Sequence, residues 1–383
     1  MDFTFTADQE ELIRTLRVFA KRQIAPHSRQ WDRTSEFPRD VCRKMAELGL
    51  FGFRVPEEFG GQPTDLLTMG IAVQEIARAD FSLTGVMDNA MLAGELLGAG
   101  SPREIKKEWL PAVARGERVF SLALTEPSVG SDAAKLACKA ARDGDDYVIT
   151  GEKSGITFAM AADVAIVYAR TDSRSGARGV SAFLVPLDRP GVSRSPLRDL
   201  GCRLMQRAVL SFDHVRIPVS HRIGQEGTGF SQVMRVFDVN RIMLALGCLG
   251  VAEVTLDETM AYVKERRAFG RTLAQFEGLS FPIAEAATYL DAAKWLCYRG
   301  LWLADRGETQ TKEGAMAKWW VPKIAVQTIH QCLLTHGHYG YTEELPFEQR
   351  LRDVMGFEIG DGTAEISKIV VARELMGRET LPY

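Results

Sequence analysis

The sequence predicts a mostly helical α+β protein with an N-terminal helical domain (1–117), a middle antiparallel, barrel-like β domain (118–225) and a C-terminal four-helix bundle (226–383). Two observations lead to this fold class. Apolar residues recur every three and four positions in the first and last regions, which is typical of amphipathic helices. Between these regions the pattern changes to short β-branched runs separated by loops. At 383 residues the chain is also long for a single core, so several domains are expected.

The N-terminal region opens on a predicted helix. Acidic residues stand among its first positions, and Leu12, Leu16 and Phe19 follow helical spacing. These features predict a capped helix rather than a signal peptide, which begins with a basic segment. Pro38 and the loop from 56 to 63 interrupt the helices that follow.

The middle region contains β-branched and aromatic runs, namely DYVITG, DVAIVYAR, GVSAFLVPL and AVLSFDHVRIP. Loops such as TDSRSGARG (171–179) separate them, which predicts antiparallel strands. After Gly227 long amphipathic stretches return, among them VAEVTLDETMAYVKERRAF (251–269). These stretches predict a helical bundle.

Composition excludes several classes of function. The net charge of −3 argues against a nucleic-acid partner, because phosphate binding requires a basic excess. We find no apolar run of the roughly 18 residues that a membrane helix needs, so no membrane association is expected. The six cysteines are scattered and form no Cys-x-x-Cys pair. Free buried thiols in a cytoplasmic protein without a metal site are therefore expected.

The segment RLRDVMGFEIGDGTAEISKIVVARELMGR (350–378) resembles the C-terminal signature of the acyl-CoA dehydrogenase family. In that signature an arginine–aspartate pair leads to Glu-Gly-Thr and a helix, and the glutamate is the catalytic base. Asp361 stands at its position, so the resemblance implies a carboxylate base with an arm one methylene shorter. It also implies the three-domain fold of this family, a substrate contact at Gly362 and a cofactor contact at Thr363.

The segment LALTEPSVGSD (122–132) resembles the first signature of the same family, in which Thr-Glu-Pro precedes Gly-Ser-Asp. The resemblance implies that Thr125 hydrogen-bonds the flavin ring of FAD, that Ser131 holds its pyrophosphate and that Leu122 lies against the cofactor. Fixed dipoles beside a flavin stabilise the negative charge that it acquires during turnover. A simple capped turn is the alternative interpretation, because Pro, Gly, Ser and Asp are turn formers.

The stretch GEKSGITFAMAADVAIVYARTD (151–172) resembles the family's Gly-x-Lys-x-Trp-Ile-Thr-Asn strand pair. The match implies that Thr157 hydrogen-bonds flavin N5 and that Ile156 contacts the cofactor. Gly155 replaces the tryptophan that covers the flavin, and Phe158 replaces the asparagine. We expect the missing indole to open space beside the ring. The alternative is that Gly155 marks only a strand bulge.

The segment FDVNRIMLALGCLG (237–250) resembles the helix that grips coenzyme A. By this match Phe237, Asp238 and Arg241 bind the thioester substrate, and an arginine suits its polar groups as a fixed multiple donor. Related enzymes with a displaced base carry a glutamate one residue before that arginine, where this chain has Asn240. The alternative is a surface arginine paired with Asp238 one helical turn away.

Two further segments resemble parts of the family that reach a neighbouring subunit. YVKERRAFGRTLAQFEG (262–278) matches its Arg-x-x-Phe-Gly motif, so Arg266 and Phe269 are expected to contact the neighbour's FAD. HGHYGYTEELPFEQRLRD (336–353) matches the glycine-rich turn that packs on the adenosine half, with Gly337 in that role. The resemblance therefore implies a homo-oligomer, and a tetramer is favoured.

Asp88 stands on an otherwise apolar helical stretch, LTGVMDNAMLAGELL (83–97), where family members line the acyl pocket. Some members that act on cyclohexane- or cyclohexene-carboxyl-CoA use an aspartate on this helix as a base at a remote ring carbon. The hypothesis is that Asp88 faces the acyl group, as a base or as a polar contact. The alternative is an exposed or helix-capping aspartate.

The resemblance covers nearly the whole chain and implies FAD-dependent α,β-dehydrogenation of an acyl-CoA thioester. Asp361 would take the α-proton and flavin N5 the β-hydride, with an electron-transferring flavoprotein as acceptor. The shorter base favours a bulky or alicyclic acyl group. One alternative is a flavin oxidase resembling nitroalkane oxidase, which carries an aspartate at this position. Another is an idle, DNA-associated member of the alkylation-response branch, against which the acidic balance argues.

Overall fold

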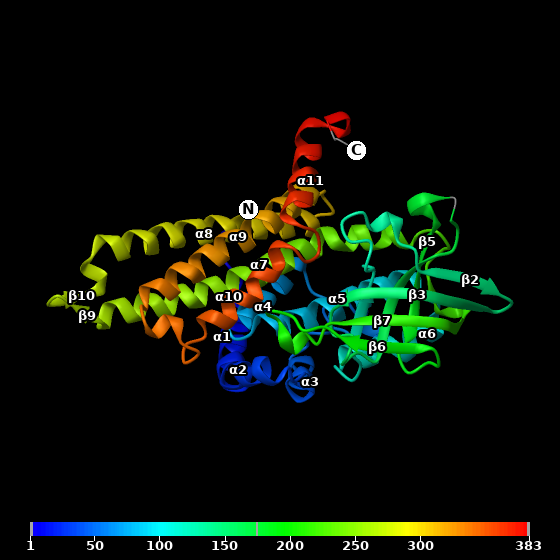
Figure 1. Ribbon diagram of the computed structural model, residues 1–383, viewed down its shortest axis with the longest axis horizontal. Helices are drawn as coiled ribbons and strands as arrows, with labels where there is room; N and C mark the ends of the chain where they lie inside the picture. Colours follow the sequence, from blue (N-terminus) through cyan, green and yellow to red (C-terminus); the bar gives the residue numbers. More distant parts are fainter. Residues whose placement is uncertain (1–2, 174, 381–383) are drawn as a thin grey trace.

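The computed structural model describes residues 3–173 and 175–380 and places the β domain at one end of a long helical body (Figure 1). A small two-stranded hairpin, β9 (Arg267–Ala268) with β10 (Arg271–Thr272), lies at the opposite end. The N-terminal helices up to residue 77 pack along the middle of this body, and those from 81 to 114 extend to the β sheet (Figure 1). The predicted fold class is confirmed.

Side-chain caps define the N-terminal helices. Thr6 caps α1 by accepting from the Gln9 amide at 3.2 Å, which confirms the predicted capped helix. Asp65 and Asp80 cap α4 and α5 in the same way, and both helices are buried over most of their surface. The helices are α1 (Ala7–Phe19), α2 (Ala25–Thr34), α3 (Arg39–Glu47), α4 (Leu66–Ala77), α5 (Phe81–Gly100) and α6 (Arg103–Ala114), with a π-helical turn at Ala20–Ile24.

The middle region forms one eight-stranded sheet in the order β6-β7-β3-β2-β4-β5-β8, with β1 paired to β4. Most pairs are antiparallel, as predicted. The contacts of β4 with β1 and β2 are parallel instead, because the chain between those strands and β4 is long enough for a crossover. The strands are β1 (Phe120–Ala123), β2 (Lys139–Asp143), β3 (Asp146–Ile156), β4 (Val164–Arg170), β5 (Val180–Pro186), β6 (Val192–Pro196), β7 (Ala208–Pro218) and β8 (Arg222–Ile223).

The C-terminal bundle is built around α7, whose 37 residues run from the β domain to the β9–β10 hairpin (Figure 1). At 1.5 Å per residue this helix is about 55 Å long. It crosses α4 closely: a side chain at Gly250 would begin 2.2 Å from the carbonyl oxygen of Gln74. The helices are α7 (Gly229–Glu265), α8 (Glu277–Asp305), α9 (Thr311–Thr335), α10 (Phe347–Met355) and α11 (Ala364–Met376).

The arginine–aspartate pair of the C-terminal signature joins the three regions. Arg352 on α10 holds the buried Asp32 of α2 through two hydrogen bonds, at 2.7 and 3.3 Å. Its neighbour Asp353 accepts from the Cys202 amide of the β domain at 2.5 Å. These buried contacts fix the orientation of α10, and therefore of the loop that follows it.

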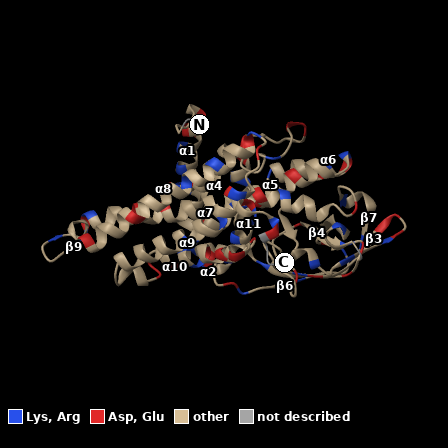
Figure 2. Ribbon diagram, turned by 90° about the horizontal axis from the view of Figure 1, so that it is seen from above, with Lys and Arg blue, Asp and Glu red and all other residues tan. Residues whose placement is uncertain are grey.

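The buried apolar residues of the three regions form one continuous hydrophobic cluster. All six cysteines are buried and unpaired, as expected. By length and composition α7 could cross a membrane, but 78% of its most apolar window is buried inside the protein. Among the described residues no group of three or more His, Cys, Asp and Glu side chains could hold a metal ion. Basic and acidic residues are interspersed along the helices (Figure 2).

Candidate active site

Asp361 lies in the turn between the short 3-10 segment Gly356–Glu358 and α11, and its backbone is left-handed, with φ 53°. Aspartate is one of the few L-residues that adopt this conformation at modest cost. Gly362 continues the turn with φ 96°. Thr363 then caps α11, since its side-chain oxygen accepts from the Ile366 amide at 3.2 Å. The turn and the cap together fix the point from which the carboxylate projects.

Lys318, a residue that the sequence interpretation missed, is hydrogen-bonded to this turn. Lys318 on α9 is fully buried, and its Nζ donates to the carbonyl oxygens of Phe357, at 2.7 Å, and Gly362, at 2.9 Å. The two carbonyls stand on either side of Asp361. Lys318 stands within the largely apolar stretch AMAKWWVPKIAV (315–326). A lysine in such a stretch is the sequence signal that could have drawn attention to this residue.

Three cations act on the Asp361 carboxyl. The residue reaches solvent in the single chain, yet the protein packed around its carboxyl raises its pKa by desolvation. Lys318, Arg241 and Arg207 oppose that rise, in decreasing order of effect. Because these cations come from α9, from α7 and from the residue before β7, Asp361 lies where the bundle meets the β domain. The arrangement favours an ionised carboxylate with the basicity that proton abstraction needs.

Asp88 is buried on α5, with 3% of its surface exposed, and α5 is capped by Asp80 instead. The interpretation of Asp88 as an exposed or capping residue is therefore wrong. Neither of its carboxyl oxygens has a hydrogen-bond partner among the described residues. Burial raises its pKa well above the usual value, and the charge of Asp361 raises it further. The structure thus brings the two predicted catalytic carboxyls close enough to interact.

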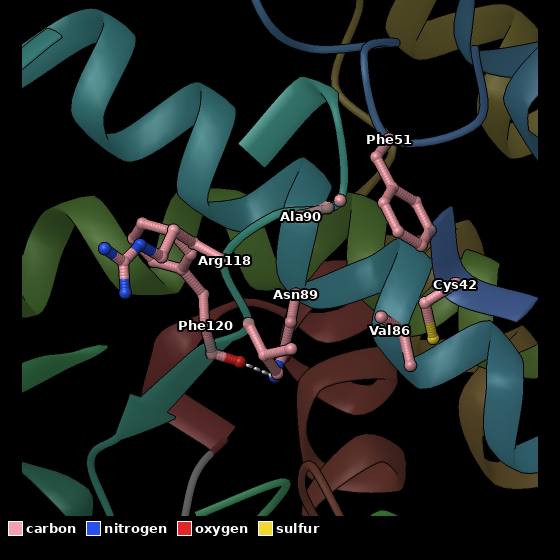
Figure 3. A pocket seen from close by; sticks show the side chains of 9 residues that line it. Cys42, Phe51, Val86, Asn89, Ala90, Arg118 and Phe120 are labelled. Atoms are coloured by element: carbon pink, nitrogen blue, oxygen red, sulfur yellow. Dashed lines mark hydrogen bonds between the residues drawn. The ribbon is translucent and has the colours of Figure 1, made fainter. Parts of the chain in front are cut away.

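The two faces of α5 contact different parts of the protein. Figure 3 shows Val86, Asn89 and Ala90 around a cavity of about 10 Å³, with Asn89 donating to the carbonyl oxygen of Phe120 at 2.8 Å. Successive helical residues are about 100° apart, so Asp88 lies roughly on the opposite side. On that side the Phe81 ring meets Phe357 edge-on, at 4.6 Å between centroids. Asp88 therefore shares a face with the residue that contacts the Asp361 turn.

The predicted coenzyme A residues stand together near the start of α7. Nη1 of Arg241 donates to Oδ1 of Asp238 at 2.7 Å, and the Thr311 hydroxyl donates to Oδ2 at 2.8 Å. The pairing that the alternative interpretation expected is therefore present. The Arg241 side chain is only 13% exposed, however, so it is not a surface residue. Asp238 orients Arg241 toward Asp361, and Phe237 is partly buried beside them.

The two predicted flavin threonines lie on adjacent chain segments. The Ser154 amide of β3 donates to the Thr125 carbonyl at 2.9 Å, and the Ser121 hydroxyl of β1 donates to the Thr157 carbonyl at 2.8 Å. Buried Lys153 donates to Leu124 and to Glu126, at 3.0 and 2.8 Å, and so clamps the turn after β1 onto β3. Leu122 lies on β1 and Ile156 at the end of β3. The segment 122–132 is therefore not only a capped turn, because it is hydrogen-bonded to β3.

These groups fit a flavin. Within the described chain the hydroxyls of Thr125, Ser131 and Thr157 are engaged in no hydrogen bond, and the first two residues are exposed. Hydroxyl donors at the end of a rigid sheet suit the polar edge and phosphates of FAD.

Arg207 occupies part of the space that the absent indole was expected to leave open. A side chain at Gly155 would begin 2.8 Å from Nη2 of Arg207, and Gly155 has φ 69°. Nε of Arg207 donates to the Gly155 carbonyl at 3.3 Å. The strand register also shifts between Lys153 and Ile156, so the bulge interpretation of Gly155 holds as well. Arg207 had no role in the sequence interpretation.

Arg266, Phe269 and Gly337 lie at the far end of the bundle from the flavin threonines. Arg266 directly follows the last residue of α7 as its C-cap, and Phe269, in the β9–β10 hairpin, is 94% exposed. Gly337 follows His336, whose ring stacks on Tyr262 of α7 at 4.1 Å. Figure 1 shows that the length of α7 separates this group from β3. One chain alone therefore cannot bring these residues to its own Thr125 and Thr157.

Comparison with known proteins identifies the family. Three family models match in order: acyl-CoA dehydrogenase N-terminal domain over residues 6–117, middle domain over 121–215 and C-terminal domain over 227–376. The chain is 38% identical to the mitochondrial short-chain specific acyl-CoA dehydrogenase of Bos taurus, covering 95% of this chain and 89% of the relative. It is 34% identical to the caffeyl-CoA reductase-Etf complex subunit CarC of Acetobacterium woodii, covering 97% and 99%.

Solved structures agree with this assignment. The butyryl-CoA dehydrogenase of Megasphaera elsdenii superimposes with a TM-score of 0.94 at 29% identity, covering 98% of this chain and all of that one. PigA with FAD and proline superimposes with a TM-score of 0.95 at 26% identity, covering 99% and 100%. FAD is the cofactor of this fold, and the chain is an oxidoreductase acting on CH–CH groups. The protein belongs to the acyl-CoA dehydrogenase family.

Proposed function

We propose that Asp361 removes the α-proton of an acyl-CoA thioester in an α,β-dehydrogenation. FAD, when bound, accepts the hydride from the β-carbon. The observation that carries the proposal is the junction at Asp361, where a turn fixed by Lys318 faces Arg241 of the coenzyme A helix. Arg207 acts on this base and also donates to the Gly155 carbonyl near the end of β3, which supports a position for the base between the predicted coenzyme A helix and Thr157. This placement suits a thioester that lies between base and cofactor.

The residues around Asp361 supply the proton chemistry. Desolvation raises the pKa of its carboxyl, which strengthens it as a base, while Lys318, Arg241 and Arg207 keep the ionised form accessible. Arg241, held by Asp238, is directed at the polar part of the substrate. Once Asp361 has taken the α-proton its carboxyl is neutral, so Lys318, Arg241 and Arg207 no longer face a negative charge on it. Proton release to solvent then restores the base.

The length of the base supports a proposal for the substrate class. The aspartate arm is about 1.5 Å shorter than a glutamate arm, and a misplacement of about 1 Å can lower a rate on the order of a hundredfold. We therefore propose an acyl group that places its α-carbon nearer to Asp361 than a linear chain does. Cyclohexane- and cyclohexene-carboxyl-CoA have this character, and Asp88 would face their rings.

The distal residues and one relative support a proposal for the assembly and the electron acceptor. Arg266, Phe269 and Gly337 would complete the FAD site of a neighbouring subunit, which supports a homo-oligomer, with a tetramer favoured. The name of the CarC relative places that protein in a complex with an electron-transferring flavoprotein. We propose a flavoprotein of this kind as the acceptor here. A cytoplasmic location agrees with the six free thiols.

One other function has an observation in its favour. An aspartate at the base position also suits an oxidase resembling nitroalkane oxidase, which needs no coenzyme A. The largely buried Arg241, oriented by Asp238 on the predicted coenzyme A helix, argues against such an enzyme.

The test is anaerobic bleaching of the flavin absorbance of the holoenzyme by butyryl-, isobutyryl-, cyclohexanecarboxyl- and cyclohex-1-enecarboxyl-CoA. We expect fastest bleaching by an alicyclic thioester, and loss of bleaching in Asp361→Asn with the visible flavin spectrum retained. Bleaching by a nitroalkane and by no thioester would show that the protein is an oxidase instead. Bleaching by neither would identify an idle member.

A further inference from the structure

Asp88 differs from every other buried acidic residue that the structure describes. The others are satisfied by partners: Asp32 by Arg352, Glu75 by Arg17, Asp80 by Ser28, Glu126 by Lys153, Glu313 by Arg299 and Asp353 by the Cys202 amide. Both carboxyl oxygens of Asp88 are buried and unpartnered. A buried polar group without a partner is costly, and a ligand atom at this position would supply the missing contact.

The surroundings of Asp88 select its protonation state. Within residues 3–173 and 175–380 the one charged group that acts on the Asp88 carboxyl is Asp361, and no cation does. Asp361, in contrast, faces Lys318, Arg241 and Arg207. Two nearby carboxyls in such different settings ionise separately: the one beside cations keeps its charge, and the other keeps its proton. A neutral carboxyl has one O–H donor, so Asp88 can donate where Asp361 can only accept.

The direction of that donor follows from the helix faces. Asp88 is on the side of α5 where Phe81 meets Phe357, next to the Asp361 turn. On the same side a side chain at Gly85 would contact Met205, 2.9 Å away, and the Phe158 ring, so the β domain closes this region. An acyl group whose α-carbon lies at Asp361 would direct its remaining atoms toward these elements and toward Asp88.

We propose that Asp88 is a neutral carboxylic acid that donates a hydrogen bond to an oxygen atom on the acyl group beyond its β-carbon. The preferred substrates are then alicyclic or branched acyl-CoA thioesters that carry a keto, hydroxyl or ether oxygen. This inference rests on the proposed dehydrogenation, and it assigns Asp88 to substrate recognition rather than to a second proton abstraction.

A matched pair of substrates tests the donor. 4-Oxocyclohexanecarboxyl-CoA and cyclohexanecarboxyl-CoA differ in one ketone oxygen, which can only accept a hydrogen bond. In the wild-type holoenzyme we expect kcat/KM to favour the ketone about fivefold to tenfold, the effect of one neutral hydrogen bond. Asp88→Asn keeps an N–H donor and should retain that preference. Asp88→Leu has no donor and should reduce the ratio to about one.

Several outcomes would overturn the inference while leaving the dehydrogenase function intact. One is a wild-type ratio near one. Another is loss of bleaching with cyclohexanecarboxyl-CoA in both variants, which would make Asp88 a base. A third is an inverted ratio, because an ionised Asp88 would repel the ketone. Failure of the proposed function is distinct, since then neither thioester would bleach the wild-type flavin.

A measurement on the wild-type enzyme makes the test independent of the folding of the variants. Infrared difference spectra would be recorded on binding of each thioester to enzyme whose flavin has been reduced beforehand, so that no turnover occurs. A protonated carboxyl has a carbonyl stretch that a carboxylate lacks, and donation to the ketone should lower its frequency with the 4-oxo thioester alone. Absence of a protonated carboxyl band, or an equal shift with both thioesters, would contradict the proposal.

Discussion

The ammonium group of Lys318 lies 2.9 Å from the carbonyl oxygen of Gly362, the residue that follows Asp361. A second donation, to Phe357, at 2.7 Å, fixes the other side of the same turn. A single buried side chain thus sets both the position of the base and part of its electrostatic environment. In this fold the shortened base is supported from α9, an element that is 43 residues away in the chain, counting from 318 to 361.

Replacement of this lysine should change the pH profile as well as the rate. In Lys318→Met the turn loses two donors and Asp361 loses its strongest cation, so turnover should fall about 10- to 100-fold. The pKa of Asp361 should rise, because the charge that opposed its desolvation is gone. Since the base must be ionised, the acidic limb of kcat should move to higher pH.

The profile would be measured with the best thioester and ferrocenium as acceptor. Lys318→Arg is the control, because it keeps the charge with an altered reach. A fall in kcat with an unmoved acidic limb would mean that Lys318 only supports the turn.

Lengthening the base should change which acyl groups react. Asp361→Glu restores one methylene and brings the carboxylate about 1.5 Å further into the site. We expect the ratio of kcat/KM for butyryl-CoA over cyclohexanecarboxyl-CoA to rise about 10- to 100-fold. Rates of anaerobic flavin bleaching give the ratio. An unchanged ratio would show that the acyl specificity does not depend on the length of the base.

The distal arginine should control cofactor binding. Arg266→Ala removes a predicted charge-assisted contact to the neighbour's pyrophosphate, so the Kd of FAD should rise about tenfold or more. Arg267 is an exposed arginine in the adjacent position, on β9, which makes Arg267→Ala the matched control. FAD titration of the apoprotein by fluorescence measures both. Equal affinities in the two variants would rule out this role for Arg266.

The buried aspartate that joins α10 to the β domain should make stability depend on pH. Burial, and next the nearby Asp80, raise the pKa of Asp353 to about 8, and the Cys202 amide opposes this. The unfolded chain releases this proton at about pH 4, whereas the folded chain holds it until about pH 8. The folded state therefore binds more protons between these limits, and stability should fall as pH rises through this window.

Asp353→Asn should flatten this dependence, on the order of 1 to 3 kcal/mol between pH 5 and 8. Urea denaturation at each pH gives the free energy of unfolding. Part of the slope should remain, because burial also raises the pKa of Asp80, to about 6. The exposed Asp188→Asn is the control. A slope that is the same in both variants would place the proton uptake elsewhere.

Much of this protein could be predicted from local patterns in the sequence. Thr6 and Gln9 form a capping box within four residues, and the β-branched runs pair as strands because alternation and turns act over short distances. The Asp361 turn, the Thr125 and Thr157 signatures and the Arg241 helix lie in contiguous motifs. A short motif can therefore assign the family without any knowledge of the core.

The ionisation of the two site carboxyls, Asp88 and Asp361, could be read only from the tertiary structure. Asp88 and Asp361 are far apart in sequence, and nothing local shows that one is buried without a partner while the other faces Lys318, Arg241 and Arg207. Nor could Gly155 reveal that Arg207 occupies the space beside it. The ionisation of a carboxyl depends on desolvation and on charges within a few ångströms, and folding brings those charges together from separate helices and strands.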